Sequence, residues 1–270
     1  RQMCIRDSPK SGWLSRLWGK IMKGRQIFLD HLKDRELAAL VVDGRLQDLF
    51  IETDALSPGS IFKGKADRPA KGQGGIFLSM PEGKGFLRQI KGVSQGQSLL
   101  VQVSGYAEAG KAVPVTTKLL FKSRFVIVTP EAPGLNISRR IRDEELRDRL
   151  IEFMHDALAP LNYGMILRSS CLTADFDDIL EDARLVLDAA LTVMTDDDPG
   201  PCMLLEAEGP HQMAWREWGD VDLIEANAGC IEDSGVLDQI EALHSPKVEI
   251  GTSTYFVEQT RALTAIDVNT

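Results

Sequence analysis

The chain has 270 residues, of which 43% are hydrophobic and 26% charged, and its formal net charge is −9. Such a composition is ordinary for a globular protein, and no apolar run approaches the ~20 residues that a membrane span requires. Taken over the whole chain, the negative charge argues against a simple nucleic-acid-binding protein.

The cysteines and the first residues bear on location and on where the fold begins. The four cysteines form no CxxC pair, so the sequence indicates neither a zinc site nor a disulfide framework, and free thiols fit a reducing cytoplasm. The opening residues, RQMCIRDSPKSGWLSRLWGK, are basic but hold no sustained apolar core, which excludes a secretory signal. We interpret residues 1–21 either as a disordered or weakly amphipathic leader or as translated sequence ahead of a start at Met22.

Three strand-like segments come next in the chain. They lie at Gln26–Leu32, Leu37–Val42 and Leu46–Ile51. The Asp43-Gly44 pair between the last two predicts a tight hairpin. Pro58 and Gly59 then interrupt the pattern and predict a boundary at this point.

A basic segment follows this boundary. Residues 56–126 carry eleven Lys or Arg against three Asp or Glu, a local net charge of +8 that leaves −17 on the rest of the chain. Short strands alternate there with Gly-rich turns, which predicts a small closed barrel. Phe77 and Phe86 lie on two of these strands. They are either barrel core or exposed rings on which unpaired bases stack, with lysines such as Lys111 following the phosphate backbone.

Helical periodicity appears after the barrel. Apolar residues recur at helical spacing in Asp143–Leu158, Asp175–Met194 and Ile231–Leu243. The acidic run Asp196–Asp198 lacks a calcium-loop spacing, so we expect a solvated helix exit. Cys202–Leu205 and Met213–Trp218 are predicted as strands, and we expect Trp215 and Trp218 to have packing roles.

The last residues form a short apolar strand that ends in Asp267-Val-Asn269 and follows a predicted hairpin from Thr254–Val257. Because side chains alternate along a strand, Asp267 and Asn269 share a face. A carboxylate beside an amide at a strand end can hold a divalent cation and a phosphate oxygen. The alternative is a polar strand terminus that leads into a turn.

Several segments resemble one known family. They are IFKGK at 61–65, GGIF at 74–77, GFL at 85–87, VQV at 101–103, GLNISRRI at 134–141, GMILRSSC at 164–171 and ALTAIDVNT at 262–270. Together they resemble the ribonuclease E/G family of bacterial endoribonucleases, which cut single-stranded RNA. MKGRQIFLD at Met22 is similar to the opening of short family members.

The resemblance implies an α+β fold. In it, an RNase H-like subdomain is interrupted by an OB-fold β-barrel and a 5′-sensor-like α/β region, and the chain ends in the first strands of a DNase I-like subdomain. The implied boundaries are a leader at 1–21, RNase H-like parts at 22–55 and 200–245, the barrel at 56–117, the sensor-like region at 118–199 and the DNase I-like start at 246–270.

The resemblance also implies site residues. Asp267 matches the first of two aspartates that hold Mg²⁺ in the family, and Asn269 matches the amide beside it. The second aspartate and the family's zinc-binding cysteine motif would lie downstream of this sequence. Phe77 and Phe86 match stacking phenylalanines, and Lys111 matches an RNA-contacting lysine.

A 5′-phosphate pocket is implied at Arg168 and Ser169, which match an Arg–Thr pair of the family. Arginine binds a terminal phosphate bidentately, and a hydroxyl adds a hydrogen bond. Ser123 stands where the family has a glycine, and Ile127 replaces a valine of the same pocket wall. The alternative is a structural arginine at a strand end.

We therefore expect a Mg²⁺-dependent endoribonuclease for RNA processing and decay, present here as an incomplete and inactive fragment. The rival is a non-catalytic protein that binds single-stranded RNA through its barrel. Expected partners are single-stranded RNA and, in the full-length protein, a second copy of the chain; no membrane span is expected.

Overall fold

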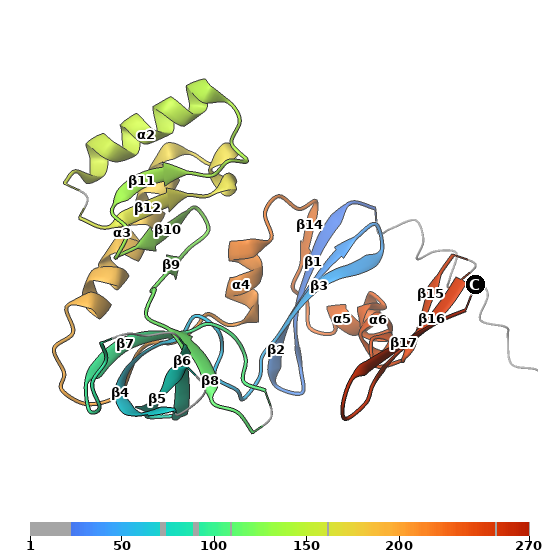
Figure 1. Ribbon diagram of the computed structural model, residues 1–270. Coiled ribbons are helices and arrows are strands. Elements are labelled where there is room, and N and C mark those ends of the chain that lie inside the picture. Colours follow the sequence, from blue (N-terminus) through green and yellow to red (C-terminus); the bar gives the residue numbers. More distant parts are fainter. Residues whose placement is uncertain are drawn as a thin grey trace, which may run out of the picture. The chain divides into compact units, whose positions relative to one another are not determined.

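The computed structural model describes residues 23–70, 74–88, 92–108, 110–160, 162–251 and 253–269. The fold is mixed α+β and contains a closed five-strand barrel (Figure 1). The chain divides into two compact units, one formed by residues 53–219 and the other by the residues before and after them. The leader at 1–21 lies outside the described residues, and the finer subdomain boundaries stay predictions.

The discontinuous unit contains a four-stranded sheet in the order β14-β1-β2-β3, with β14 parallel to β1. Its strands are β1 (Arg25–Leu32), β2 (Arg35–Val42), β3 (Arg45–Ile51) and β14 (Leu223–Glu225). The three predicted strands and their hairpin are therefore confirmed. Asp43 and Gly44 have φ of 48° and 78°, and positive φ at both central residues is what a two-residue hairpin turn of this kind requires.

Two short helices, α5 (Cys230–Asp233) and α6 (Val236–Ala242), pack on this sheet. The prediction of one helix over Ile231–Leu243 was wrong. Gly235 has φ of 70°, and this left-handed conformation ends one helix before the next begins. The shared core is made of buried residues from the sheet and both helices, including Phe28, Val41, Ile231 and Val236.

A second sheet of the same unit is antiparallel and holds the last three strands, β15 (Lys247–Ile250), β16 (Ser253–Gln259) and β17 (Thr264–Asn269). The predicted terminal strand and hairpin are confirmed. Directly paired residues share a face of a sheet. Val257 pairs with Ile266 and Tyr255 with Val268, so one face is apolar, whereas Asp267 pairs with Phe256 on the other face.

The barrel of the continuous unit consists of β4 (Ile61–Ala70), β5 (Gly75–Met80), β6 (Gly83–Arg88), β7 (Ser98–Val103) and β8 (Val113–Thr116). It closes because β4 pairs with both β5 and β7. Strand β13 (Cys202–Leu205) adds to β4 from outside, which confirms that predicted strand. Alternate residues point inward, and the core includes Phe62, Leu78 and Val101.

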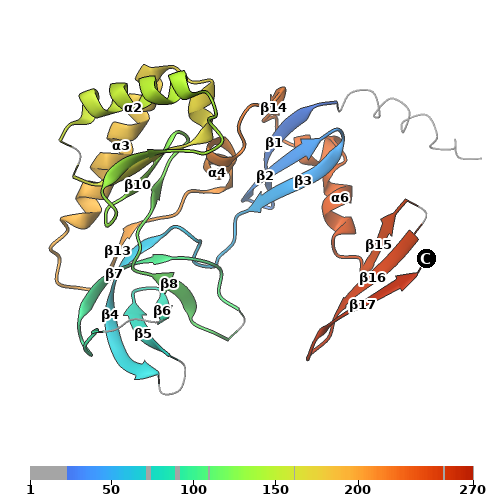
Figure 2. The same cartoon turned by 45° about the horizontal axis from the view of Figure 1, so that its top comes forward.

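A four-stranded sheet follows, in the order β11-β12-β10-β9. Its strands are β9 (Phe121–Lys122), β10 (Val126–Thr129), β11 (Gly134–Ile137) and β12 (Gly164–Leu167). Helices α2 (Glu144–Leu158) and α3 (Phe176–Met194) contact this sheet and each other (Figure 2). Both were predicted, and the Asp143 carboxylate accepts a hydrogen bond from the Leu146 N–H as an N-cap.

Helix α4 (Pro210–Glu217) occupies the segment predicted as a strand at Met213–Trp218, so that prediction was wrong. Proline favours the first helical turn, because its fixed φ suits a helix and no N–H is needed there. Pro210, Ala214 and Trp218 are buried at four-residue spacing, whereas Trp215 is 59% exposed. The packing role is confirmed for Trp218 and was wrong for Trp215.

A buried lysine ties the exit of α3 to the barrel. Lys63 on β4 forms an ion pair with Asp196 and donates a hydrogen bond to the Asp198 carbonyl at 2.5 Å. The hydrogen bond to Asp196 raises the pKa of Lys63. The expected solvated helix exit was therefore wrong for Asp196, although Asp197 and Asp198 are exposed.

Candidate nucleic-acid interface and anion site

Two phenylalanines form a pair on the outside of the barrel. Phe77 on β5 is directly opposite Phe86 on β6, and their ring centroids lie 5.2 Å apart with the planes tilted by 51°. Leu78 and Leu87, the next residue on each strand, are buried in the barrel core, so strand alternation directs the two rings outward. Both rings are partly exposed. The interpretation of Phe77 and Phe86 as barrel core is therefore wrong.

A glycine leaves room for one of these rings. A Cβ atom placed on Gly75 would lie 2.6 Å from the Phe86 ring, closer than side chains tolerate. Gly75 and Phe86 are close neighbours on adjacent strands, because Gly75 pairs with Arg88, two residues beyond Phe86. The absence of a side chain at Gly75 thus leaves space for the Phe86 ring beside β5.

Two cations accompany Phe86 on the same face of β6. Lys84 and Arg88 are exposed and alternate with the buried residues Gly85 and Leu87. Sequence reasoning assigned them no individual role, although the alternation in KGFLR is a local signal that places both beside Phe86. The outer face of β5 and β6 therefore combines aromatic rings with positive charge.

Lys111 lies in the turn that precedes β8 and is exposed. Its ammonium forms an ion pair with Glu108 at 2.5 Å. The hydrogen bond from Lys111 lowers the pKa of Glu108, and the Arg88 charge lowers it further. Strand β8, which follows the Lys111 turn, pairs with β6, and Pro114 lies opposite Phe86.

Arg168 follows β12 and immediately precedes η1 (Ser169–Leu172). Its guanidinium donates to the Ser123 carbonyl and, through Nη2, to the Glu217 carboxylate at 2.6 Å. Ser169 is adjacent and partly exposed. The structure thus places Arg168 and Ser169 together, as expected, but it also gives Arg168 an acidic partner on α4. Sequence reasoning missed Glu217, which lies 49 residues away.

Ser123 connects this arginine to α3. Its hydroxyl donates to the Asp182 carboxylate at 2.5 Å, and the same carboxylate oxygen accepts the Phe125 N–H at 3.0 Å. The Ser123 hydroxyl is thereby engaged with α3, while its backbone carbonyl is engaged with Arg168. Ile127, the other departure in this wall, lies half-buried on β10.

A second arginine lies over an aromatic ring next to this site. The Arg124 guanidinium is 4.1 Å from the centroid of the Trp215 ring, and its Nη1 donates to the Trp215 carbonyl at 3.1 Å. This cation–π contact joins the loop after β9 to α4. It was not predicted, because it connects residues that are distant in sequence.

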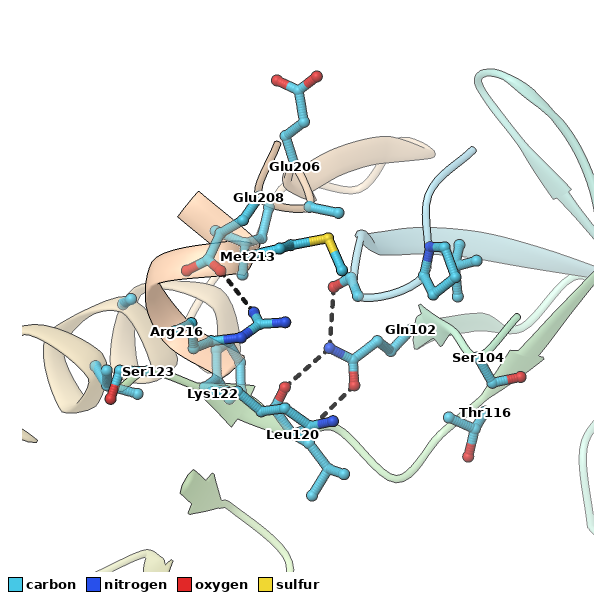
Figure 3. A pocket seen from close by; sticks show the side chains of 18 of the residues that line it. Gln102, Ser104, Thr116, Leu120, Lys122, Ser123, Glu206, Glu208, Met213 and Arg216 are labelled. Carbon is cyan, nitrogen blue, oxygen red and sulfur yellow. Dashed lines mark hydrogen bonds and ion pairs between the residues drawn. The ribbon is translucent and has the colours of Figure 1, made fainter. Parts of the chain in front are cut away.

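A cavity of about 560 Å³ lies among the barrel, α3 and α4 of the continuous unit (Figure 3). Gln102 crosses its floor, donating to the carbonyls of Gly59 and Leu120 and accepting from the Leu120 N–H, each at 2.9 Å. Arg216 reaches into it and pairs with Glu208 at 2.6 Å. Burial raises the pKa of Glu208, and Arg216 opposes that effect.

Asp267 lies exposed on β17. Asn269 belongs to the same strand, two residues further on. The side chain of Asn269 is outside the described part of the chain. Among the described residues, Asp267 belongs to no group of three or more His, Cys, Asp or Glu that could hold a metal ion. In the same residues, no helix is long and apolar enough to span a bilayer.

Comparison with known proteins gives consistent matches. The model of the ribonuclease E/G family matches residues 121–222. Ribonuclease G of Salmonella typhimurium is 26% identical over 293 residues, covering 86% of this chain and 60% of that protein. Ribonuclease E of Nostoc sp. is 24% identical over 171 residues, covering 57% of this chain and 25% of that protein. Ribonuclease E of Synechocystis sp. is 27% identical over 164 residues, covering 54% and 24%.

A closed barrel whose outer face presents paired rings among cations is typical of domains that bind single-stranded nucleic acid. The family model over residues 121–222 and the similarity to ribonucleases E and G support the ribonuclease E/G family for this chain, in agreement with the resemblance. The matched part of the chain spans 24% to 60% of the length of these three relatives.

Proposed function

We propose that the chain serves a Mg²⁺-dependent endoribonuclease that cleaves single-stranded RNA in the cytoplasm. The observation that carries the proposal is the outward-facing pair of Phe77 and Phe86, bordered by Lys84 and Arg88. In this proposal the barrel is an OB-fold, the flanking α/β regions are RNase H-like and 5′-sensor-like, and the last sheet begins a DNase I-like subdomain.

The barrel surface would bind RNA by stacking and by charge. Every base has a π-face, so two adjacent rings accept unpaired bases with little sequence preference. Lys84, Arg88 and Lys111 would neutralise phosphates and release condensed counterions, which makes affinity fall as salt rises. Base-paired RNA hides its faces in the helix stack, so the surface favours single strands.

The metal would be held at the final sheet. Asp267 offers one exposed carboxylate, which fits the oxygen ligands and low protein ligand count that Mg²⁺ accepts. The resemblance supplies a second aspartate from outside this chain and gives Asn269 the role of positioning the aspartate or the phosphate. Bound there, Mg²⁺ would activate water and neutralise phosphate charge.

The experiment that tests catalysis uses the full-length enzyme and its Asp267→Asn variant. We expect the variant to lose Mg²⁺-dependent cleavage of a single-stranded RNA while its RNA affinity changes by less than about twofold, because affinity is located in the barrel. Glu258→Gln, which removes a neighbouring exposed carboxylate on β16, is the control and should cleave normally. Normal cleavage by Asp267→Asn would contradict the assignment.

The second candidate is a non-catalytic protein that binds single-stranded RNA. It is favoured by one observation, the outward-facing rings and cations of the barrel, which would bind RNA without any metal ion. Both candidates predict RNA binding by the barrel. Cleavage by the full-length protein, lost on removal of Mg²⁺ with a chelator, separates them.

A further inference from the structure

Arg168, which the resemblance assigns to a 5′-terminal phosphate, forms an ion pair with the carboxylate of Glu217 in the same chain. Arg168 Nη2 lies 2.6 Å from Glu217 Oε2, and Arg168 Nη1 donates to the Ser123 carbonyl. The two side chains are 19% and 32% exposed, so the contact is largely withdrawn from solvent. Ion pairs of low exposure are screened less than surface pairs, and Arg168 is held in one orientation.

Glu217 also forms an ion pair with a second arginine, Arg216. Its second oxygen, Oε1, accepts from Arg216 Nε at 2.8 Å. Arg216 also donates through Nη1 to Glu208 at 2.6 Å. One carboxylate therefore lies between two guanidinium groups, with one oxygen on each. Guanidinium groups bind carboxylates and phosphates through the same donor geometry, so Glu217 takes the place that a phosphate monoester would need.

The charges of the surrounding groups also disfavour a phosphate at Arg168. Burial alone would raise the pKa of Glu217, but Arg168 and Arg216 outweigh burial and hold that pKa below its usual range. The carboxylate is therefore ionised at neutral pH. The two arginines face Glu217, Glu208 and Asp182, which also interact electrostatically with one another. A phosphate dianion would meet a cluster whose positive charge is already neutralised.

We infer that Glu217 is a specificity-determining residue that occupies Arg168 in place of a 5′-terminal phosphate, so that this protein binds RNA with little regard to its 5′ end. The inference rests on the proposed RNA-binding function and concerns only its dependence on the 5′ terminus. Binding of a terminal phosphate at Arg168 requires Glu217 to leave, which also breaks the contact with Arg216.

The test compares the affinity of the 270-residue chain for two single-stranded RNA oligonucleotides of the same sequence, one with a 5′ monophosphate and one with a 5′ hydroxyl. Fluorescence anisotropy of a 3′-labelled strand gives both dissociation constants. For the wild type we expect the ratio of the two dissociation constants, 5′ hydroxyl over 5′ monophosphate, to lie within about twofold of one. For Glu217→Gln we expect about tenfold tighter binding of the 5′-monophosphate strand, the size of one charge-assisted hydrogen bond. Glu217→Ala should behave alike.

Two further variants give the controls. Glu206→Gln removes a carboxylate that lines the same cavity and is exposed, and its ratio should match the wild type. Arg168→Ala combined with Glu217→Gln should return the ratio to the wild-type value, because the phosphate then has no guanidinium to bind. A general charge effect would instead raise the ratio in Glu206→Gln and leave it raised in the double variant, and either result would overturn the inference.

The wild-type measurement depends on no substitution. A wild-type preference of tenfold or more for the 5′-monophosphate strand would overturn the inference, because Glu217 would then not block Arg168. If both proteins bind RNA and the ratio of dissociation constants is the same in the wild type and in Glu217→Gln, the inference is overturned but the proposed function is not. Failure of the wild-type chain to bind either strand would overturn the proposed function and this inference with it.

Discussion

Lys63 on β4 and Asp196 at the exit of α3 form a buried ion pair within the continuous unit. The same ammonium donates to the backbone carbonyls of Asp196 and Asp198, at 3.1 Å and 2.5 Å, so all its donors have protein acceptors. This lysine therefore joins the barrel to the helix that follows it, and it contributes nothing to the charge that the barrel surface presents.

Replacing Lys63 should lower stability and leave RNA binding unchanged. In Lys63→Met the aliphatic stem is retained, but Asp196 loses its cation and two carbonyls lose a donor. We expect a lower Tm by circular dichroism and an unchanged salt dependence of RNA affinity. Lys65→Met, at an exposed position on the same strand, is the control and should keep the wild-type Tm.

The cations beside Phe86 should contribute to the salt dependence of binding. Each phosphate contact adds about 0.7 to the slope of log affinity against log salt for single strands. Lys84→Gln and Arg88→Gln should each reduce the slope by roughly that amount and weaken binding of different RNA sequences alike. The measurement is a titration at several salt concentrations, and an unchanged slope in both variants would place the RNA elsewhere.

Asp30 on β1 should make the stability of the discontinuous unit dependent on pH. Its carboxylate accepts the N–H groups of His31, Gly229 and Ile231, at 2.8, 3.3 and 3.1 Å. Burial by itself raises the pKa of Asp30, but these hydrogen bonds prevail and lower it. A lowered folded pKa means that the stabilisation is present above the unfolded value of about 3.9 and is lost as pH falls through the folded pKa.

Asp30→Ala should therefore destabilise the protein by about 0.5–2 kcal/mol at pH 7, the range measured for lost helix caps. The difference from the wild type should shrink as pH is lowered below about 4. Thermal unfolding across this pH range measures it, and Asp48→Ala, at an exposed position on β3, serves as the control. A difference that is constant with pH would show that the Asp30 charge does not matter.

The elements that could be predicted from the sequence are those specified locally. Asp43 and Gly44 suit the positive φ of their turn, and the apolar period of α2 and α3 spans whole helices. Residues 213–218 were misassigned because six residues fit both a helix and a strand, and the decisive signal, Pro210 after Gly209, stands ahead of them.

The site was predictable only in part, for the same reason. The aromatic pair follows from strand alternation once the register is known, so Phe77 and Phe86 could be named from the sequence. Glu217 could not, because its contact with Arg168 depends on the tertiary position of α4 relative to the residues that follow β12. Lys63 counts as a basic residue in the sequence, yet its burial beside Asp196 is a tertiary effect.

The most direct test of the central claim is the affinity of the chain for single-stranded RNA when Phe77 and Phe86 are both replaced by alanine. Each ring should contribute about 1–3 kcal/mol, so the double variant should bind at least about 30-fold more weakly. Phe50→Ala, on β3 outside the barrel, is the control and should bind as the wild type does. Unchanged affinity in a folded Phe77→Ala, Phe86→Ala variant would contradict the account, because the RNA would then not stack on the outer face of the barrel.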